Sequence, residues 1–294
     1  MLMTLRRRTA PLFAHLGAAA LRVPFLRHSL GLWLWRFIDR YVSFFEVQAT
    51  KPTRFGPSLH VSSEPRVENE IFYFGEWEPL LTRHLLDRQP DDGVFVDIGA
   101  NIGYFSLLAA QRFGEVHAVE ASPHTVARLR DHVARNGIAN VVVHPVAIGP
   151  ARGRVAFYAD EAHRGGSSLE PGGGRVFESE VEMLPLADIL SGVDPARLRF
   201  FKIDVEGAEP AVLASIAAMA GDLAAGTEVL VEYHPQNADA LWPAIDALQR
   251  AGFDTFALQG TYDRTEYIDR ERRSAMATIT ARPVAFCDIL LRKR

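Results

Sequence analysis

The segment "VFVDIGANIGYFSLL", Val94 to Leu108, joins two apolar runs through an aspartate and two glycines that lie four residues apart. Asp97 lies near the end of a predicted strand, and Gly99 and Gly103 lie in the turn before a predicted helix. In an open parallel sheet, ligands bind at the carboxyl ends of the strands, where this first turn lies. We expect Gly99 to let the backbone approach a ligand and Gly103 to begin the helix. The turn is therefore a candidate binding corner.

The corner differs from a dinucleotide-binding turn. Asn101 stands where the G-x-G-x-x-G fingerprint has its second glycine, and Asp97 places a carboxylate where a pyrophosphate would need donors. Glu120 ends the next strand, 21 residues after Gly99, at the position from which an acidic side chain binds ribose hydroxyls. Carboxylates favour a cationic ligand. A nucleoside with a cationic centre and no phosphate fits, which predicts S-adenosylmethionine.

A second acidic segment, "FFKIDVEGAEP", runs from Phe200 to Pro210. Lys202, Asp204 and Glu206 alternate with apolar residues, so they share one face of a strand that cannot be plain core. We expect Asp204, at the strand tip, to point into the same crevice as the first aspartate. Glu206 lies near the first turn of the following helix, where a favourable interaction with the helix dipole is an alternative to substrate binding.

The segment "VLVEYHP" supplies Glu232 and His234 at the end of another strand. Histidine is a candidate general base because its pKa lies near working pH, although a lone histidine also serves structural roles. We therefore take Asp204 and His234 as candidate catalytic residues, and Glu206 and Glu232 as candidate substrate-binding residues. Hard divalent cations prefer such oxygens, but nothing in the spacing requires a metal, and none is expected.

The strands and helices that position these residues are predicted by alternating sequence patterns. They predict an α/β, Rossmann-like fold with a mostly parallel seven-stranded sheet, helices on both faces and an antiparallel last strand. The predicted strands are Val94–Ile98, Glu115–Glu120, Val141–Ile148, Phe200–Val205, Val229–Tyr233, Phe253–Leu258 and Ala285–Leu291. The predicted helices are Tyr104–Arg112, Thr125–Arg135, Ala208–Met219 and Ala238–Ala251.

Residues 159–180 interrupt this pattern with five glycines. We interpret them as a mobile loop or lid close to whatever the sheet binds. His144, His163 and Arg164 are weaker candidates for holding the acceptor there.

Charge is unevenly spread along the chain. Residues 1–60 hold nine Arg or Lys and two Asp or Glu, whereas the remainder holds 23 and 34. An acidic body argues against a nucleic-acid groove, and a single cysteine excludes a disulfide framework and a cysteine metal site. We predict a basic helical extension over residues 1–60 and a catalytic domain over 61–294.

The extension carries apolar residues at helical spacing from Leu30 to Phe45. Such a stripe packs against the body, which is the favoured interpretation. The alternative is a basic amphipathic helix that rests on a membrane or a partner. The expected location is the cytoplasm, with peripheral contact to the inner membrane face through residues 1–60 as the alternative.

Several segments together resemble the FkbM family of class I methyltransferases. They are "FVDIGANIGYFSLLAA", "VHAVEASP", "NVVVHPVAIG", "SSL", "FFKIDVEGAE" and "VLVEYHP", and the similarity covers about Glu70 to Leu291. The resemblance implies S-adenosylmethionine-dependent O-methylation of a hydroxyl on a sugar, glycan or natural product.

The resemblance also implies roles for individual residues. Asp97, Gly99, Asn101 and Gly103 would hold the methionine part of the cofactor and Glu120 its ribose. Further cofactor contacts are implied in the matching segments at Ala121 and Ala147. The segment "FGEWEPLLTRHL" resembles the family's entry segment and makes Glu76 a candidate substrate-binding residue.

The expected reaction is direct transfer of the methyl group to an acceptor oxygen, with Asp204 or His234 accepting the proton. One alternative is a nucleotide-dependent oxidoreductase, which would need a third glycine and a pyrophosphate site. Another is a membrane-associated binding module that has kept the fold and lost transfer. The expected partner is a small-molecule or glycan acceptor, whose identity the sequence leaves open.

Overall fold

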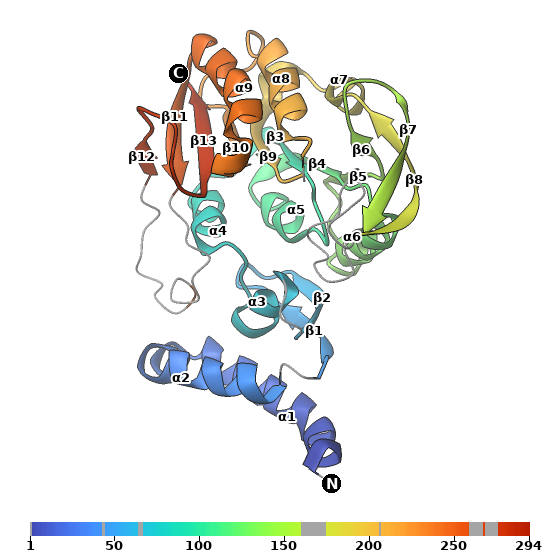
Figure 1. Ribbon diagram of the computed structural model, residues 1–294, viewed down its shortest axis with the longest axis vertical. Coiled ribbons are helices and arrows are strands. Elements are labelled where there is room, and N and C mark those ends of the chain that lie inside the picture. Colours follow the sequence, from blue (N-terminus) through green and yellow to red (C-terminus); the bar gives the residue numbers. More distant parts are fainter. Residues whose placement is uncertain are drawn as a thin grey trace. The chain divides into compact units, whose positions relative to one another are not determined.

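The computed structural model describes residues 2–42, 45–63, 67–159, 175–205, 207–258, 267 and 276–294. The chain divides into two compact units (Figure 1). The first consists of residues 1–83 and 261–273, and the second of residues 84–260 and 274–294.

The second unit is built on a sheet of eight strands in the order β12-β11-β13-β10-β9-β3-β4-β5. The five strands from β10 to β5 run parallel, whereas β13 pairs antiparallel with both β10 and β11. This confirms the predicted α/β, Rossmann-like fold and its antiparallel last strand. The short β12 adds one edge strand to the seven that were predicted. The bounds are β3 Asp91–Ile98, β4 Phe113–Val119, β5 Val141–His144, β9 Leu198–Ile203, β10 Glu228–Tyr233, β11 Phe253–Leu258, β12 Met276–Thr278 and β13 Cys287–Lys293.

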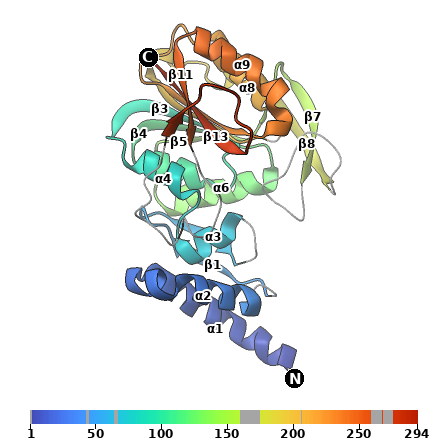
Figure 2. The same cartoon turned by 60° about the vertical axis from the view of Figure 1, so that its left-hand side comes forward.

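Helices cover both faces of this sheet (Figures 1 and 2). Apolar side chains of α7, α8 and α9 form one core cluster with those of β3, β9 and β10. On the other face, Leu129 of α6 packs against Ala100 and Ala118. The bounds are α5 Tyr104–Ala109, α6 Pro123–Arg135, α7 Leu186–Ile189, α8 Glu209–Ala218 and α9 Ala238–Arg250, with short 3-10 helices at Pro195–Arg197 and Pro235–Asn237. Helix α4 (Pro79–Leu86) contains the division between the two units.

The predicted strand Val141–Ile148 is wrong in its second half. The main sheet keeps β5, and after Pro145, which has no N–H to donate to a ladder, the chain enters β6 (Ala147–Ile148). Strand β6 pairs with β8 (Val176–Leu184), which pairs in turn with β7 (Gly153–Ala159) in a separate three-stranded sheet.

The predicted loop over residues 159–180 is therefore partly wrong, because both of its ends belong to strands of this smaller sheet. Residues 160–174, which include His163 and Arg164, lie outside the described residues. Helix α5, which follows β3, ends at Ala109, three residues earlier than predicted.

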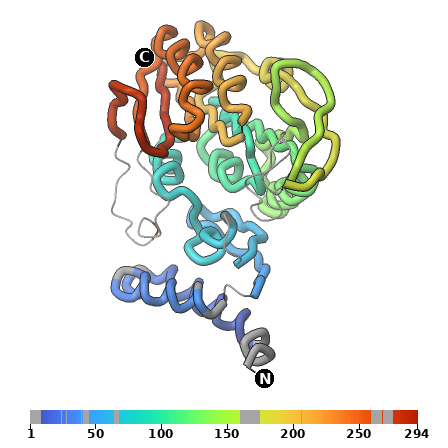
Figure 3. Tube along the Cα trace, viewed as in Figure 1, coloured from blue at the N-terminus to red at the C-terminus, as the bar shows by residue number. Residues whose placement is uncertain are grey.

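The first unit contains two long helices and a hairpin (Figure 3). Helices α1 (Leu2–Arg22) and α2 (Pro24–Val42) pack closely, since a Cβ on Gly17 would overlap the Ile38 side chain. Strands β1 (Gln48–Pro52) and β2 (Ser58–Ser62) pair antiparallel, and α3 (Val67–Phe74) follows. The predicted boundary after residue 60 falls within β2. Among the described helices, none is both long and apolar enough to cross a membrane.

Candidate functional site

Asp97 is a buried carboxylate at the carboxyl end of β3. Its Oδ2 accepts a hydrogen bond from Ser106 Oγ at 2.6 Å. Its Oδ1 is also buried and has no hydrogen-bond partner among the described residues. Burial raises the pKa of Asp97, and the nearby Lys202 charge and the Ser106 bond partly oppose that shift. The side chain is thus held in place by one oxygen while the other can accept a donor.

Lys202 lies beside this aspartate on the adjacent strand β9. The two residues are register partners in the parallel ladder, and only 4% of Lys202 is exposed. Its Nζ lies 2.8 Å from Asp204 Oδ2 and 5.2 Å from the centre of the Phe105 ring. The Asp204 side chain is 49% exposed. Lys202, which the sequence placed on this face without a role, therefore links a buried carboxylate to an exposed one.

The two glycines of the turn are required by packing. Gly99 has φ +83°, and a Cβ there would overlap the carbonyl oxygen of Asp204. Gly103 lies at the N-terminus of α5, where the sequence predicted the helix start. Its φ is +89°, and a Cβ there would overlap the Leu129 side chain. Gly99 therefore brings the ends of β3 and β9 together, which is a reason for glycine that the sequence did not reveal.

Glu120, directly after β4, is bound by backbone amides of its surroundings. The Asn101 N–H donates to Oε2 at 2.9 Å and the Ser122 N–H donates to Oε1 at 2.9 Å. Asn101 has φ +50°, a conformation in which its N–H is aimed at this carboxylate. Burial raises the pKa of Glu120 to about 7. The corner consequently presents carboxylate acceptors where a phosphate would need free N–H donors.

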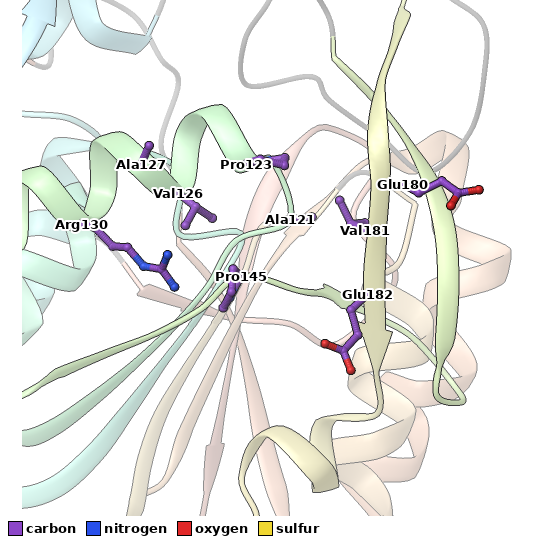
Figure 4. A pocket seen from close by; sticks show the side chains of 9 residues that line it. All are labelled: Ala121, Pro123, Val126, Ala127, Arg130, Pro145, Glu180, Val181 and Glu182. Carbon is purple, nitrogen blue, oxygen red and sulfur yellow. The ribbon is translucent and has the colours of Figure 1, made fainter.

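Ala121 and Ala147 lie close to each other beyond this carboxylate. Ala147 is buried with Phe157 and Val181, and Ala121 packs against the same cluster. Ala121 also lines a hollow of about 260 Å³ between α6 and β8, into which Arg130 extends (Figure 4). The other residues that line the hollow are Pro123, Val126, Ala127, Pro145, Glu180, Val181 and Glu182.

Glu232 and His234 lie at the carboxyl end of β10. Leu230 pairs with Lys202 in the ladder, so Glu232 lies on the same sheet face as Lys202, one step nearer the carboxyl edge. His234 Nε2 lies 3.4 Å from Glu232 Oε2, and its ring contacts that of Phe286. Both side chains are partly exposed and can reach a ligand. No group of three or more His, Cys, Asp or Glu side chains suited to a metal occurs among the described residues.

Three further candidates have different surroundings. Glu206 lies outside the described residues. Glu76 belongs to the first unit, where it is buried and lies 2.8 Å from Arg54 Nη1. His144 Nε2 bonds His117 Nδ1 at 2.9 Å, and burial lowers the pKa of His144 to about 4. His144 is therefore uncharged near neutral pH and engaged with another histidine.

Comparison with known families identifies the family of this chain. The family model described as the methyltransferase FkbM domain matches residues 97–255, which is more than half of the chain and contains every candidate except Glu76. The chain belongs to the FkbM methyltransferase domain family. The resemblance seen in the sequence is thereby confirmed.

Individual relatives of this FkbM domain are distant. A protein named Methyltransferase 1 from Beauveria bassiana (strain ARSEF 2860) is 26% identical over 145 residues, which cover 42% of this chain and 58% of that protein. The match thus spans less than two thirds of that relative.

Two solved structures of similar fold share still less of the sequence. The methyltransferase FkbM from Methylobacillus flagellatus KT is 19% identical, with a TM-score of 0.48, over 73% of this chain and 47% of that one. A precorrin-6y C5,15-methyltransferase from Geobacter metallireducens GS-15 is 16% identical, with a TM-score of 0.40, over 74% and 86%.

Proposed function

We propose that this protein uses S-adenosylmethionine to methylate a hydroxyl group on a sugar, glycan or natural product. The observation that carries the proposal is the buried Oδ1 of Asp97, which lacks a hydrogen-bond partner among the described residues. Buried polar atoms are normally paired. A cationic donor such as the cofactor's ammonium group would supply a strong, charge-assisted bond at this position.

Another buried carboxylate of the same sheet differs from Asp97 because both of its oxygens have partners. Glu228, at the opposite end of β10, accepts bonds on both oxygens from His84, Arg88 and Arg292 at 2.7–2.8 Å. Its pKa is lowered by these partners despite its burial. Glu228 therefore has a complete set of protein partners, whereas Asp97 keeps one acceptor for a ligand.

The other residues of the corner suit the ribose and the adenine of the same cofactor. Glu120 would bind the ribose hydroxyls through lone pairs that its two amide partners leave available. Ala121 and Ala147 offer an apolar wall for the adenine ring. When bound, the cofactor supplies an electrophilic methyl group on a sulfonium.

The acceptor hydroxyl must lose a proton during transfer, and His234 is the residue we assign to receive it. With Nε2–H directed at Glu232, the opposite ring nitrogen Nδ1 can accept the proton. The neighbouring carboxylate then stabilises the imidazolium that forms. Asp204, held by the Lys202 ammonium, would orient the hydroxyl as a hydrogen-bond acceptor and is the alternative base.

The first experiment is calorimetric titration of the protein with S-adenosylhomocysteine and, separately, with NADH. We expect binding of S-adenosylhomocysteine alone, weakened at least about tenfold by Asp97→Ala and by Glu120→Ala. Asp254→Ala, which removes an exposed carboxylate on β11, is the matched control and should bind like wild type. Binding of NADH instead would contradict the proposal and favour the oxidoreductase alternative.

A second experiment tests transfer itself. The protein is incubated with S-adenosylmethionine carrying an isotopically labelled methyl group and a panel of hydroxylated sugars and natural products. We expect label to appear on an acceptor oxygen, and at a lower rate with His234→Gln. Cofactor binding without label on any acceptor would favour a binding module over an enzyme.

A further inference from the structure

Exposed apolar side chains are concentrated on the two long helices α1 and α2 of the first unit. Among the described residues, thirteen large apolar side chains are exposed, and eight of them lie between residues 12 and 37. Phe25 is 77% exposed and Trp33 is 67% exposed. Soluble surfaces carry such residues singly, and a cluster of them marks a binding surface.

Three of these residues share one side of α2 with two arginines. Phe25, Trp33, Arg36, Phe37 and Arg40 recur at helical spacing, and all five are exposed. We call them the aromatic face of α2. The rings of Trp33 and Phe37 stack with centroids 5.9 Å apart and an angle of 13° between their planes. The stacked pair forms one apolar surface, and Arg36 and Arg40 lie on the same side of the helix.

The opposite side of α2 is already used for packing. Trp35 and Ile38 are buried, and Ile38 fits against the space left by Gly17 of α1. Ser29, which lies on the exposed side, donates its hydroxyl to the Phe25 carbonyl at 2.7 Å. The polar atom of Ser29 is thereby satisfied within the helix and does not oppose the transfer of this face to an apolar medium.

The charge of this segment indicates which partner the face fits. Residues 2–42 contain seven arginines and one acidic residue, Asp39. Tryptophan favours the boundary between headgroups and acyl chains, and arginine extends its charged end to the headgroups from an apolar stem. We infer that the aromatic face of α2 binds the surface of an anionic lipid bilayer, with α2 lying in the plane of the interface. This inference does not depend on the proposed methyl transfer.

The test is sedimentation of the full chain with vesicles of phosphatidylcholine alone or mixed with phosphatidylglycerol. We expect binding to the anionic vesicles that weakens with added salt. The double variant Trp33→Ser, Phe37→Ser should reduce partitioning roughly tenfold or more. Phe177→Ser, which removes an exposed phenylalanine of β8, is the matched control and should bind like wild type. Arg36→Gln with Arg40→Gln should remove most of the preference for phosphatidylglycerol.

Quenching of tryptophan fluorescence by brominated lipid tests whether Trp33 contacts the bilayer. The conservative variant for this test is Trp33→Phe. The chain has four tryptophans, and we expect most of the quenching to disappear in Trp33→Phe while vesicle binding is retained. Quenching that persists in Trp33→Phe would overturn the assignment of this face.

Three other results would also overturn the inference. The first is absence of sedimentation with both kinds of vesicle. The second is equal binding by wild type and by the serine double variant. The third is a dimer in solution that becomes a monomer in the serine double variant, because the occupant would then be a second copy of the chain.

Discussion

Asp97 and Lys202 lie side by side as register partners on the adjacent parallel strands β3 and β9, and both are buried. Lys202 also lies 2.8 Å from the exposed Asp204, so one ammonium serves two carboxylates. Burial of an isolated carboxylate is costly, and a nearby opposite charge offsets part of that cost. Lys202 therefore lowers the cost of holding a charged Asp97 carboxylate at the edge of the sheet.

We predict that Lys202→Met destabilises the protein by about 2–4 kcal/mol at neutral pH, because it leaves the buried Asp97 without its cation. The pKa of Asp97 is already raised in the folded protein. Its contribution to stability is therefore full below the unfolded pKa and is lost as the pH rises through the folded pKa. Without Lys202 that folded pKa rises further, so the deficit of the variant should grow with pH. Urea unfolding at several pH values measures it.

The control for this prediction is a double-mutant cycle. Asp97→Asn combined with Lys202→Met removes both charges and should be less destabilised than Lys202→Met alone, with a coupling of about 1–2 kcal/mol. Additive effects of the two substitutions would mean that the ammonium does not stabilise Asp97.

Gly99→Ala is expected to destabilise the protein by about 3 kcal/mol or more. It combines a positive φ with a Cβ that overlaps the Asp204 carbonyl oxygen. Gly137→Ala is the matched control, since Gly137 has φ +63° and open space around its Cβ position. That variant should lose only about 1 kcal/mol from the backbone conformation. Equal losses in the two variants, measured by thermal unfolding, would show that contact with β9 is unimportant.

The sequence predicted much of the sheet and the position of the candidate binding corner because both depend on local patterns. Asp97 and Glu120 were found by their positions at the ends of apolar strands, and both lie at the carboxyl edge. Lys202 received no role, because its burial and its pairing with Asp97 depend on which strands are neighbours. The smaller sheet was also missed, since β6 has only two residues and its partner β8 lies about thirty residues further along the chain.

Binding of S-adenosylhomocysteine is expected to weaken as the pH falls through about 7, because burial raises the pKa of Glu120 to about 7. The protonated carboxyl accepts hydroxyl donors less well than the carboxylate does. Between about pH 8 and about pH 6, the dissociation constant should rise roughly tenfold. Calorimetry at three pH values measures it.

The stability of the free protein should change in the opposite direction over the same range. The folded pKa of Glu120 is raised, so the contribution of Glu120 to stability is full below the ordinary pKa of 4.5 and is lost as the pH rises through about 7. The ligand-induced rise in melting temperature should therefore be larger at pH 8 than at pH 6. Glu120→Gln should bind more weakly and with a smaller pH dependence, and an unchanged slope would assign the titration to another group.

His234→Gln is expected to lower kcat by about 10²–10⁴, the usual contribution of a positioned general base, with S-adenosylhomocysteine affinity unchanged. Glu232→Gln should have a smaller effect on kcat, because it removes only the carboxylate 3.4 Å from Nε2 that stabilises the imidazolium. If Asp204→Asn abolishes turnover while His234→Gln retains it, the base is Asp204, and Lys202 then has the additional role of holding that base in position.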